Sequence, residues 1–330
     1  MEIIQGVHQI KVPVPGAVDS MNIYLVEGTQ GNLLIDTGLD TPDAFGALRD
    51  ALKFSGFGFK DITVIAATHV HPHHFGLANK LKQLSGAKVA LGEIESKFID
   101  TRYGRTEALL KQVKQLLTSN GVPESDSTTL AESSLEVKEF VGVAKPDIIL
   151  KDGDKITVAS QEFKVILTPG HSTGHICFYE PKRKMFFSGD HLLPDIFPHI
   201  GYHPQSGENP LADFFKSIEA LASLDINFIF PGHGSVFSGF KLRLGELHYY
   251  HDQRQREVSR IIESDTKSAY QIAGELPWNP AGDSIQFNKL SAFDKRLAVM
   301  ETLAELKLML GQGKAQKVVK ENVDLYFAGG

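Results

Sequence analysis

Residues 68–76, with the sequence THVHPHHFG, contain four of the chain's 13 histidines. They directly follow Thr63–Ala67, a short apolar run that is typical of a buried strand, so the histidines would lie at the C-terminal end of that strand. Neutral imidazole is the commonest metal ligand in proteins, and Pro72 would stiffen a tight turn here. A surface cluster without a metal is the alternative. Because the histidines follow a buried strand, the pattern favours a metal site.

Three further segments share one layout, in which a strand leads into a glycine-containing turn with a ligand-type side chain. These segments are Phe163–Leu167 before His171, Met185–Phe187 before Asp190 and Phe228–Phe230 before His233. One such segment alone would be an ordinary loop. Together they indicate strand ends that converge on one edge of a sheet, where sheet proteins commonly place their sites.

These ligand-bearing segments follow one another along the chain after the segment LIDTG at residues 34–38. In this order of segments the chain resembles the metallo-β-lactamase superfamily as far as about residue 263. The resemblance implies an α/β fold, an αβ/βα sandwich of four layers with two mixed sheets face to face. The family motif HxHxDH corresponds to residues 69–74, HVHPHH. His73 therefore stands where the family has aspartate.

The same resemblance implies a site with two divalent transition-metal ions, zinc in the first place and iron or manganese as alternatives. A hydroxide between the ions would attack the substrate, and Asp190 and His73 would be catalytic. Asp36 would support the site without binding metal. The implied ligands are His69, His71 and His171 for the first ion, His73, His74 and His233 for the second, and Asp190 as the bridge between them.

His73 leaves three alternatives open. It could replace the aspartate as a ligand, which is the favoured reading and gives a second site that still suits zinc, iron or manganese. It could act as an acid–base group near neutral pH. The second site could also be weak, in which case the protein would be a metal-binding relic without hydrolytic activity.

The composition is that of a soluble protein with a proper core: 330 residues, 42% hydrophobic and 22% charged. The formal net charge of −6 gives no reason to expect a nucleic acid or an anionic membrane as partner. The single cysteine, Cys177, cannot form an internal disulfide, which fits a reducing compartment. No signal peptide and no membrane-spanning run are recognised, so a cytoplasmic protein is expected.

The chain is predicted to have two domains. Residues 1–264 would form the metal domain, with a mostly helical insertion at about 93–147 that lies over one face of the core. Within this insertion, Glu107–Leu117 is predicted as a helix and Gly121–Ser134 as a surface loop. Residues 265–330 show two helical stretches and then a small hairpin, which indicates a winged-helix-like domain.

The resemblance is closest to the glyoxalase II-like branch, which includes thioesterases, lactonases and some endoribonucleases. Residues 265–330 contain eight Lys and Arg against eight Asp and Glu, so an electropositive surface for phosphates is not expected there. The predicted activity is hydrolysis of a small-molecule ester or thioester; an endoribonuclease is the alternative. The C-terminal segment could be a cap, a homodimer contact or a pocket wall. His199 and Tyr202 are candidate substrate contacts, whereas His248 and His251 are assigned to a solvent-facing side of a long helix.

Overall fold

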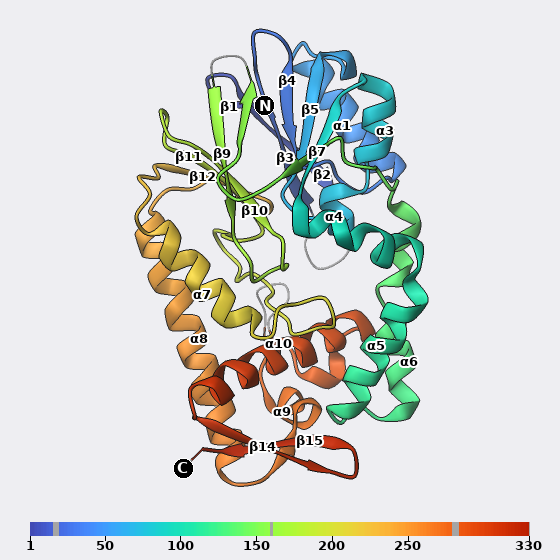
Figure 1. Ribbon diagram of the computed structural model, residues 1–330, viewed down its shortest axis with the longest axis vertical. Helices are drawn as coiled ribbons and strands as arrows, with labels where there is room; N and C mark the ends of the chain where they lie inside the picture. The colour runs from blue at the N-terminus through green and yellow to red at the C-terminus, as the bar shows by residue number, and fades with distance from the viewer. Residues whose placement is uncertain (16–19, 159–160, 279–283, 330) are drawn as a thin grey trace.

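Two β-sheets face each other in the part of the molecule that contains the N-terminus (Figure 1). The computed structural model describes residues 1–15, 20–158, 161–278 and 284–329. The first sheet has the order β1 to β7, with antiparallel neighbours as far as β4 and parallel neighbours from there on. Its strands are β1 (Glu2–Ile4), β2 (Val7–Pro13), β3 (Ser20–Val26), β4 (Asn32–Ile35), β5 (Ile62–Ala67), β6 (Lys88–Gly92) and β7 (Ile148–Leu150).

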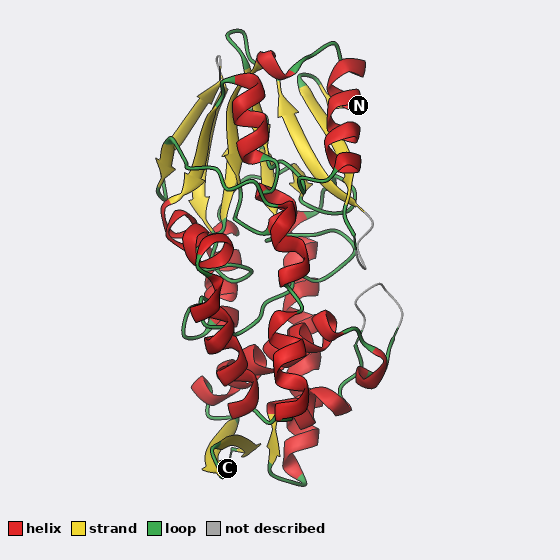
Figure 2. Ribbon diagram, turned by 90° about the vertical axis from the view of Figure 1, so that its right-hand side faces the viewer, coloured by secondary structure: helices red, strands yellow, loops and turns green. Residues whose placement is uncertain are grey.

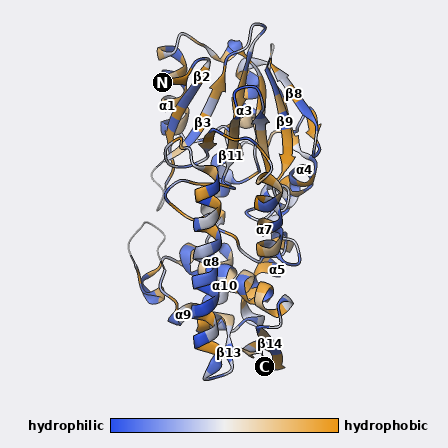
Figure 3. Ribbon diagram, turned by 90° about the vertical axis from the view of Figure 1, so that its left-hand side faces the viewer, coloured by the Kyte–Doolittle hydropathy of each residue, from blue (hydrophilic) through white to orange (hydrophobic). Residues whose placement is uncertain are grey.

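The second sheet has the order β12-β11-β10-β9-β8. Its neighbours are antiparallel except for the parallel pair β11 and β12. Its strands are β8 (Lys155–Val158), β9 (Gln161–Leu167), β10 (Ile176–Glu180), β11 (Met185–Gly189) and β12 (Phe228–Pro231). The strands of both sheets carry hydrophobic residues along much of their length in Figure 3.

The space between the sheets is filled by one hydrophobic cluster with members from both, among them Leu33 and Ile35 from β4 and Phe163, Phe187 and Phe230 from the second sheet. Helices α1 (Pro42–Phe54) and α3 (Ala78–Ser85) cover the outer face of the first sheet. Helices α7 (Pro210–Leu221) and α8 (Phe240–Glu263) cover the outer face of the second. The order helix, sheet, sheet, helix is the predicted four-layer sandwich.

The other half of the molecule is mainly helical (Figure 2). It contains α5 (Thr106–Ser119), α6 (Glu124–Glu132), α9 (Ala269–Glu275), α10 (Ala292–Gly311), the end of α8, and a small sheet of β13 (Lys267–Ser268), β15 (Val323–Ala328) and β14 (Ala315–Lys320). Helix α4 (Glu93–Ile99) follows β6 and packs on the first sheet, where its Ile99 joins the hydrophobic cluster of the outer face. Short helical turns lie at Phe59–Asp61, Asp100–Gly104, Leu135–Phe140 and Phe287–Lys289.

Two expectations for this half were wrong. The stretch Gly121–Ser134 is not a surface loop, because it contains α6, whose Leu130 and Ala131 are buried. Helices α5 and α6 also do not lie over a face of the sandwich, since their buried side chains join the cluster formed by the end of α8, α9 and α10. The predicted domain boundary at residue 264 falls between α8 and β13, and the division into two domains stays a prediction.

No helix in the described part of the chain is both long enough and apolar enough to cross a membrane.

Candidate metal centre

The ligand-type side chains predicted from the sequence meet at one edge of the sandwich. His69 follows β5, and His71 is the residue before α2 (Pro72–Phe75), which carries His73 and His74. From the second sheet, His171 follows β9, Asp190 follows β11 and His233 follows β12. Pro72 occupies the first turn of α2, where its fixed φ suits a helix start and its missing N–H costs no hydrogen bond.

The first group consists of His69, His71 and His171, whose ring nitrogens lie within 4.8 Å of one another. The Nδ1 atom of His71 is 2.8 Å from Nε2 of His69 and 2.9 Å from Nε2 of His171. The Nδ1 atom of His171 lies 2.9 Å from the carbonyl oxygen of His199, so Nδ1 must carry the hydrogen and donate it. In the neutral ring Nε2 of His171 therefore keeps its lone pair. One N–H on His71 can satisfy only one of the two nitrogens it faces. A cation fits this convergence of lone pairs better than a hydrogen bond does.

The second group consists of His73, His74, Asp190 and His233. Nδ1 of His233 donates to the carbonyl of Ser20 at 2.9 Å, which leaves its Nε2 as the free acceptor. Nε2 of His74 and Oδ1 of Asp190 are buried and have no hydrogen-bond partner among the described residues. Buried polar atoms are normally paired, so these two atoms without a partner are suited to a cation.

Asp190 lies between the two groups. Its Oδ2 is 3.3 Å from Nε2 of His74, 3.6 Å from that of His233 and 3.8 Å from that of His73. The same oxygen is 3.5 Å from Nε2 of His171 in the first group. One carboxylate oxygen therefore faces both groups, as a bridging ligand would.

Burial and the neighbouring charges set the pKa values in this metal-free arrangement. Burial lowers the pKa of His171 to about 4 and, together with the charge of His74, that of His73 to about 3. Burial acts in the same direction on His74, but the carboxylates of Asp190 and Asp36 outweigh it and raise its pKa to about 10. The pKa of Asp190 is held well below its usual value, because the charges of His74 and His233 outweigh burial. His73 and His171 are therefore neutral at pH 7 and have lone pairs available to a cation, and Asp190 is ionised.

Asp36 orients His74 through Nδ1, the ring nitrogen that does not face Asp190. Its Oδ2 accepts from Nδ1 of His74 at 2.8 Å, and its Oδ1 accepts from the backbone N–H of Thr68 at 2.8 Å. The hydroxyl of Thr68 lies 3.1 Å from both carboxylate oxygens and 3.0 Å from Nδ1 of His69. Asp36 has a φ of 62°, a strained conformation for a residue with a side chain, which the surrounding hydrogen bonds hold in place. The carboxylate thus fixes the ring that faces Asp190.

Two residues at the centre were not identified from the sequence. The buried carboxylate of Glu95 accepts from the N–H of Val70 at 2.9 Å and from that of Gly174 at 3.0 Å, which ties together the loops that carry His69 and His171. Its only sequence signal is its place shortly after β6, at the same edge of the sheet. Gly232 is the other: a Cβ atom there would lie 2.3 Å from Oδ1 of Asp190, so the loop needs glycine at this point.

The candidate substrate contacts lie beside the centre, in the loop before α7. His199 offers its carbonyl to His171, and its ring Nδ1 is 2.6 Å from a carboxylate oxygen of Glu301 on α10. The N–H of Tyr202 donates to the carbonyl of Met300 on the same helix at 2.9 Å. Their contact with a substrate stays a prediction.

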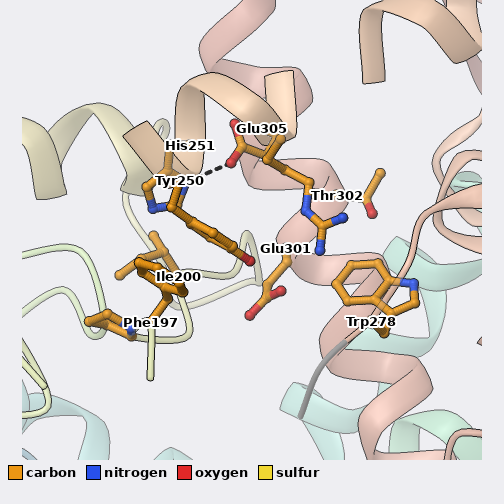
Figure 4. A pocket seen from close by; sticks show the side chains of 10 residues that line it. Phe197, Ile200, Tyr250, His251, Trp278, Glu301, Thr302 and Glu305 are labelled. Carbon is orange, nitrogen blue, oxygen red and sulfur yellow. Dashed lines mark hydrogen bonds and ion pairs between the residues drawn. The ribbon is translucent and has the colours of Figure 1, made fainter. Parts of the chain in front are cut away.

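A cavity opens between this loop, α8 and α10 (Figure 4). Its lining residues include Phe197, Tyr250, Trp278 and Glu301, and His251 and Glu305 also face it. The assignment of His251 to a solvent-facing side of α8 was wrong, because its ring is buried and its Nδ1 is 2.6 Å from the Glu305 carboxylate. His248, three residues earlier, is exposed as expected.

Comparisons with known proteins agree with this geometry. The pattern of the metallo-beta-lactamase superfamily matches residues 16–233. A Bacillus subtilis protein named "Probable metallo-hydrolase YqjP" is 26% identical over 279 residues, which cover 82% of this chain and 85% of that protein. Acyl-coenzyme A thioesterase MBLAC2 of Bos taurus is 27% identical over 232 residues, which cover 67% of this chain and 75% of the thioesterase.

Among solved structures, a metallo-beta-lactamase family protein of Thermus thermophilus superposes with a TM-score of 0.85 at 29% identity, covering 99% of this chain and 100% of that one. A beta-lactamase domain protein of Burkholderia ambifaria has the same fold, with a TM-score of 0.81 at 22% identity, covering 100% of this chain and 93% of that one. With the family pattern, the four-layer fold and the histidine and aspartate cluster in agreement, the chain belongs to the metallo-β-lactamase superfamily of metallohydrolases.

Proposed function

We propose that the protein hydrolyses small-molecule thioesters or esters with two divalent metal ions, zinc in the first place, held by the seven side chains of the candidate metal centre. The observation that carries the proposal is the position of Asp190, whose Oδ2 faces His171 of the first group and His74, His73 and His233 of the second. A carboxylate shared by two sets of ligands is suited to two ions rather than one.

The protein's own residues would orient this centre. Carbonyl groups of His199 and Ser20 and the carboxylate of Asp36 hold the rings of His171, His233 and His74, so that each presents Nε2. Such second partners fix both the tautomer and the direction of a metal-binding imidazole. When bound, the divalent ions would polarise the substrate carbonyl and lower the pKa of water to about 7, which provides a nucleophile at neutral pH.

His73 is part of this proposal as a ligand. One of its ring nitrogens lies within 4.8 Å of the ligand atoms of His74, Asp190 and His233, and its Nε2 is 3.8 Å from Oδ2 of Asp190. A neutral imidazole carries less charge than the family's aspartate but offers a lone pair that zinc accepts readily. The substitution is therefore compatible with a complete second site.

A thioester is the substrate that we favour over a nucleic acid. The MBLAC2 relatives, which are 27% identical to this chain, are named as acyl-coenzyme A thioesterases. Their names support a thioester as the substrate. The eight basic and eight acidic residues of 265–330 give this segment no net positive charge to attract a phosphate backbone.

The test is hydrolysis of the S-butyryl thioester of N-acetylcysteamine, a small uncharged substrate, with release of the thiol as the readout. We expect metal-loaded protein to release thiol and to contain two metal ions per chain by elemental analysis. His69→Ala and His171→Ala should lose both metal and thiol release. His248→Ala removes an exposed histidine outside the centre and should change neither. Metal-loaded protein that hydrolyses neither this thioester nor the corresponding oxygen ester would refute the proposal.

A further inference from the structure

We propose that Glu301 on α10 is a positioning residue for the first metal group. Its carboxylate holds the ring of His199, and His199 in turn holds His171 in the orientation that presents Nε2 to an ion. This inference rests on the proposed function, because it concerns the affinity of the same centre for its first ion. It assigns the ring of His199 to the support of a metal ligand instead of to contact with the substrate.

The direct partner of His171 is a backbone group in an irregular loop. The carbonyl oxygen of His199 lies 2.9 Å from Nδ1 of His171. A partner of this kind fixes the direction of a metal-binding ring and makes its other nitrogen a better ligand. Residues 191–209 contain no helix or strand, so no regular ladder of hydrogen bonds holds this carbonyl in place. Its position therefore depends on the contacts that the loop makes with its neighbours.

Glu301 holds the loop at the same residue that faces His171. Its Oε1 lies 2.6 Å from Nδ1 of His199. An ionised carboxylate can only accept, so Nδ1 of His199 carries the hydrogen and donates it. The side chains of His199 and Glu301 are 26% and 29% exposed, and a hydrogen bond that is partly shielded from water in this way is stronger than one at a free surface.

The loop also fits closely against the preceding residue of α10. The N–H of Tyr202 donates to the carbonyl of Met300 at 2.9 Å. A Cβ atom on Gly201 would lie 2.8 Å from Nε2 of His199 and 3.1 Å from Cβ of Met300, so glycine leaves the room that the ring needs beside the helix. Two successive residues of α10 thus determine where the carbonyl of His199 lies.

Helix α10 carries a second carboxylate that pairs with a histidine at the same distance. Oε1 of Glu305, four residues after Glu301, lies 2.6 Å from Nδ1 of His251 on α8. In Figure 4 the carboxylates of Glu301 and Glu305 point in different directions. Among the residues that the structure describes, no hydrogen bond joins the side chains of Glu305 and His251 to a metal ligand. This pair is therefore a matched comparison within the same helix.

The test measures the two stepwise zinc affinities of the full-length protein by competition with a metal-sensitive dye. His171→Ala identifies which affinity belongs to the first group. Loss of a direct partner of a metal ligand costs about 10–100-fold, and Glu301 acts one contact further out, so Glu301→Ala should weaken the first ion by about tenfold. The second ion should stay within about twofold, because its ligands have other partners.

Two further variants separate positioning from general stability. Glu301→Gln keeps an oxygen that accepts from His199 and should restore most of the lost affinity. Glu305→Gln changes the matched pair and should leave the first ion within about twofold of the parent protein. Unfolding of each metal-free variant is measured in parallel. A loss of affinity that is equal for both ions would assign Glu301 to general stability and overturn the proposal.

A double-mutant cycle tests whether Glu301 acts through His199. His199→Phe keeps a ring and the backbone carbonyl but removes the nitrogen that donates, so it should weaken the first ion as Glu301→Ala does. The double variant should lose no more than either single variant. Additive losses, or first-ion affinities within about twofold of the parent in both single variants, would overturn the proposal.

Metal binding needs no substrate, so this test is independent of the proposed reaction. A parent protein that binds two ions but releases no thiol would contradict the reaction alone. A parent protein that binds no ion would refute the metal centre and this inference together.

Discussion

His73 provides the sharpest test of the candidate metal centre, because it stands where the superfamily motif has aspartate. In His73→Ala, the second group falls from four ligand-type side chains to His74, Asp190 and His233, whereas the first group of three histidines is unchanged. We expect the variant to keep one metal ion per chain and to lose the second preferentially.

The exposure and contacts of His73 set the expected changes in stability and in metal affinity. The His73 side chain is 25% exposed, against 0% for His74 and 6% for Asp190, and its 3.8 Å approach to Asp190 is too long for a hydrogen bond. Its removal should therefore change the stability of metal-free protein by less than about 1 kcal/mol. Loss of even an outer partner of a metal ligand costs about 10–100-fold in affinity, so loss of a ligand should weaken the second site by at least about 100-fold.

Competition with a metal-sensitive dye measures both affinities, and unfolding of the metal-free protein measures stability. His73→Asp restores a carboxylate and should retain two ions and thiol release. His248→Ala is the control for removal of a histidine outside the centre. If His73→Ala still binds two ions with unchanged affinity, His73 is not a ligand. If that variant also loses a limb of the pH–rate profile near neutrality, His73 acts as an acid or base instead.

Three further predictions concern other parts of the structure. Gly232→Ala places a Cβ atom 2.3 Å from Oδ1 of Asp190 and 2.8 Å from Cε1 of His74, so metal content and thiol release should fall together; Gly245→Ala, in open space on α8, should reduce neither. Burial lowers the pKa of His191 from 6.5 to about 3. Below pH 6.5 the unfolded chain therefore binds a proton on this ring that the folded protein does not bind, and the free energy of unfolding falls. In metal-free protein this ring alone should lower the free energy of unfolding by roughly 1.5 kcal/mol between pH 6.5 and 5. His191→Phe should reduce the pH dependence of unfolding by that amount, and an unchanged dependence would contradict the assignment. Random duplex DNA at about 150 mM salt should not bind, and tight binding that depends on residues 265–330 would contradict the charge argument.

The place of the site at one sheet edge could be predicted because its signals are local, whereas the four-layer sandwich was expected from the resemblance to the superfamily. Each candidate ligand follows a short apolar run within a few residues, and the runs Thr63–Ala67 and Phe228–Phe230 correspond to β5 and β12. The strand ends of two facing sheets then bring segments more than 150 residues apart to one edge. The partners that hold the ligands could not be found in this way, since the carbonyls of Ser20 and His199 carry no residue-specific signal.

The helical half was harder to predict because its hydrophobic residues pack between distant segments. Helix α6 has a polar sequence, ESDSTTLAE, and becomes a helix with a buried side only because Leu130 and Ala131 contact a cluster that α9 and α10 complete. His251 was misplaced for the same reason: α8 is polar overall, but Glu305 from α10 pairs with this ring. Amphipathic pattern alone cannot identify a partner that lies more than 50 residues away.

The C-terminal helix and the metal centre are connected through the loop before α7, and this connection explains why an otherwise separate segment bears on the site. Glu301 of α10 pairs with the ring of His199 at 2.6 Å, and the carbonyl of the same histidine orients His171 at 2.9 Å. The backbone of Met300 holds Tyr202 in the same loop. A shift of α10 would therefore be passed to His171 through His199. Among the roles expected for the segment, these contacts favour a pocket wall.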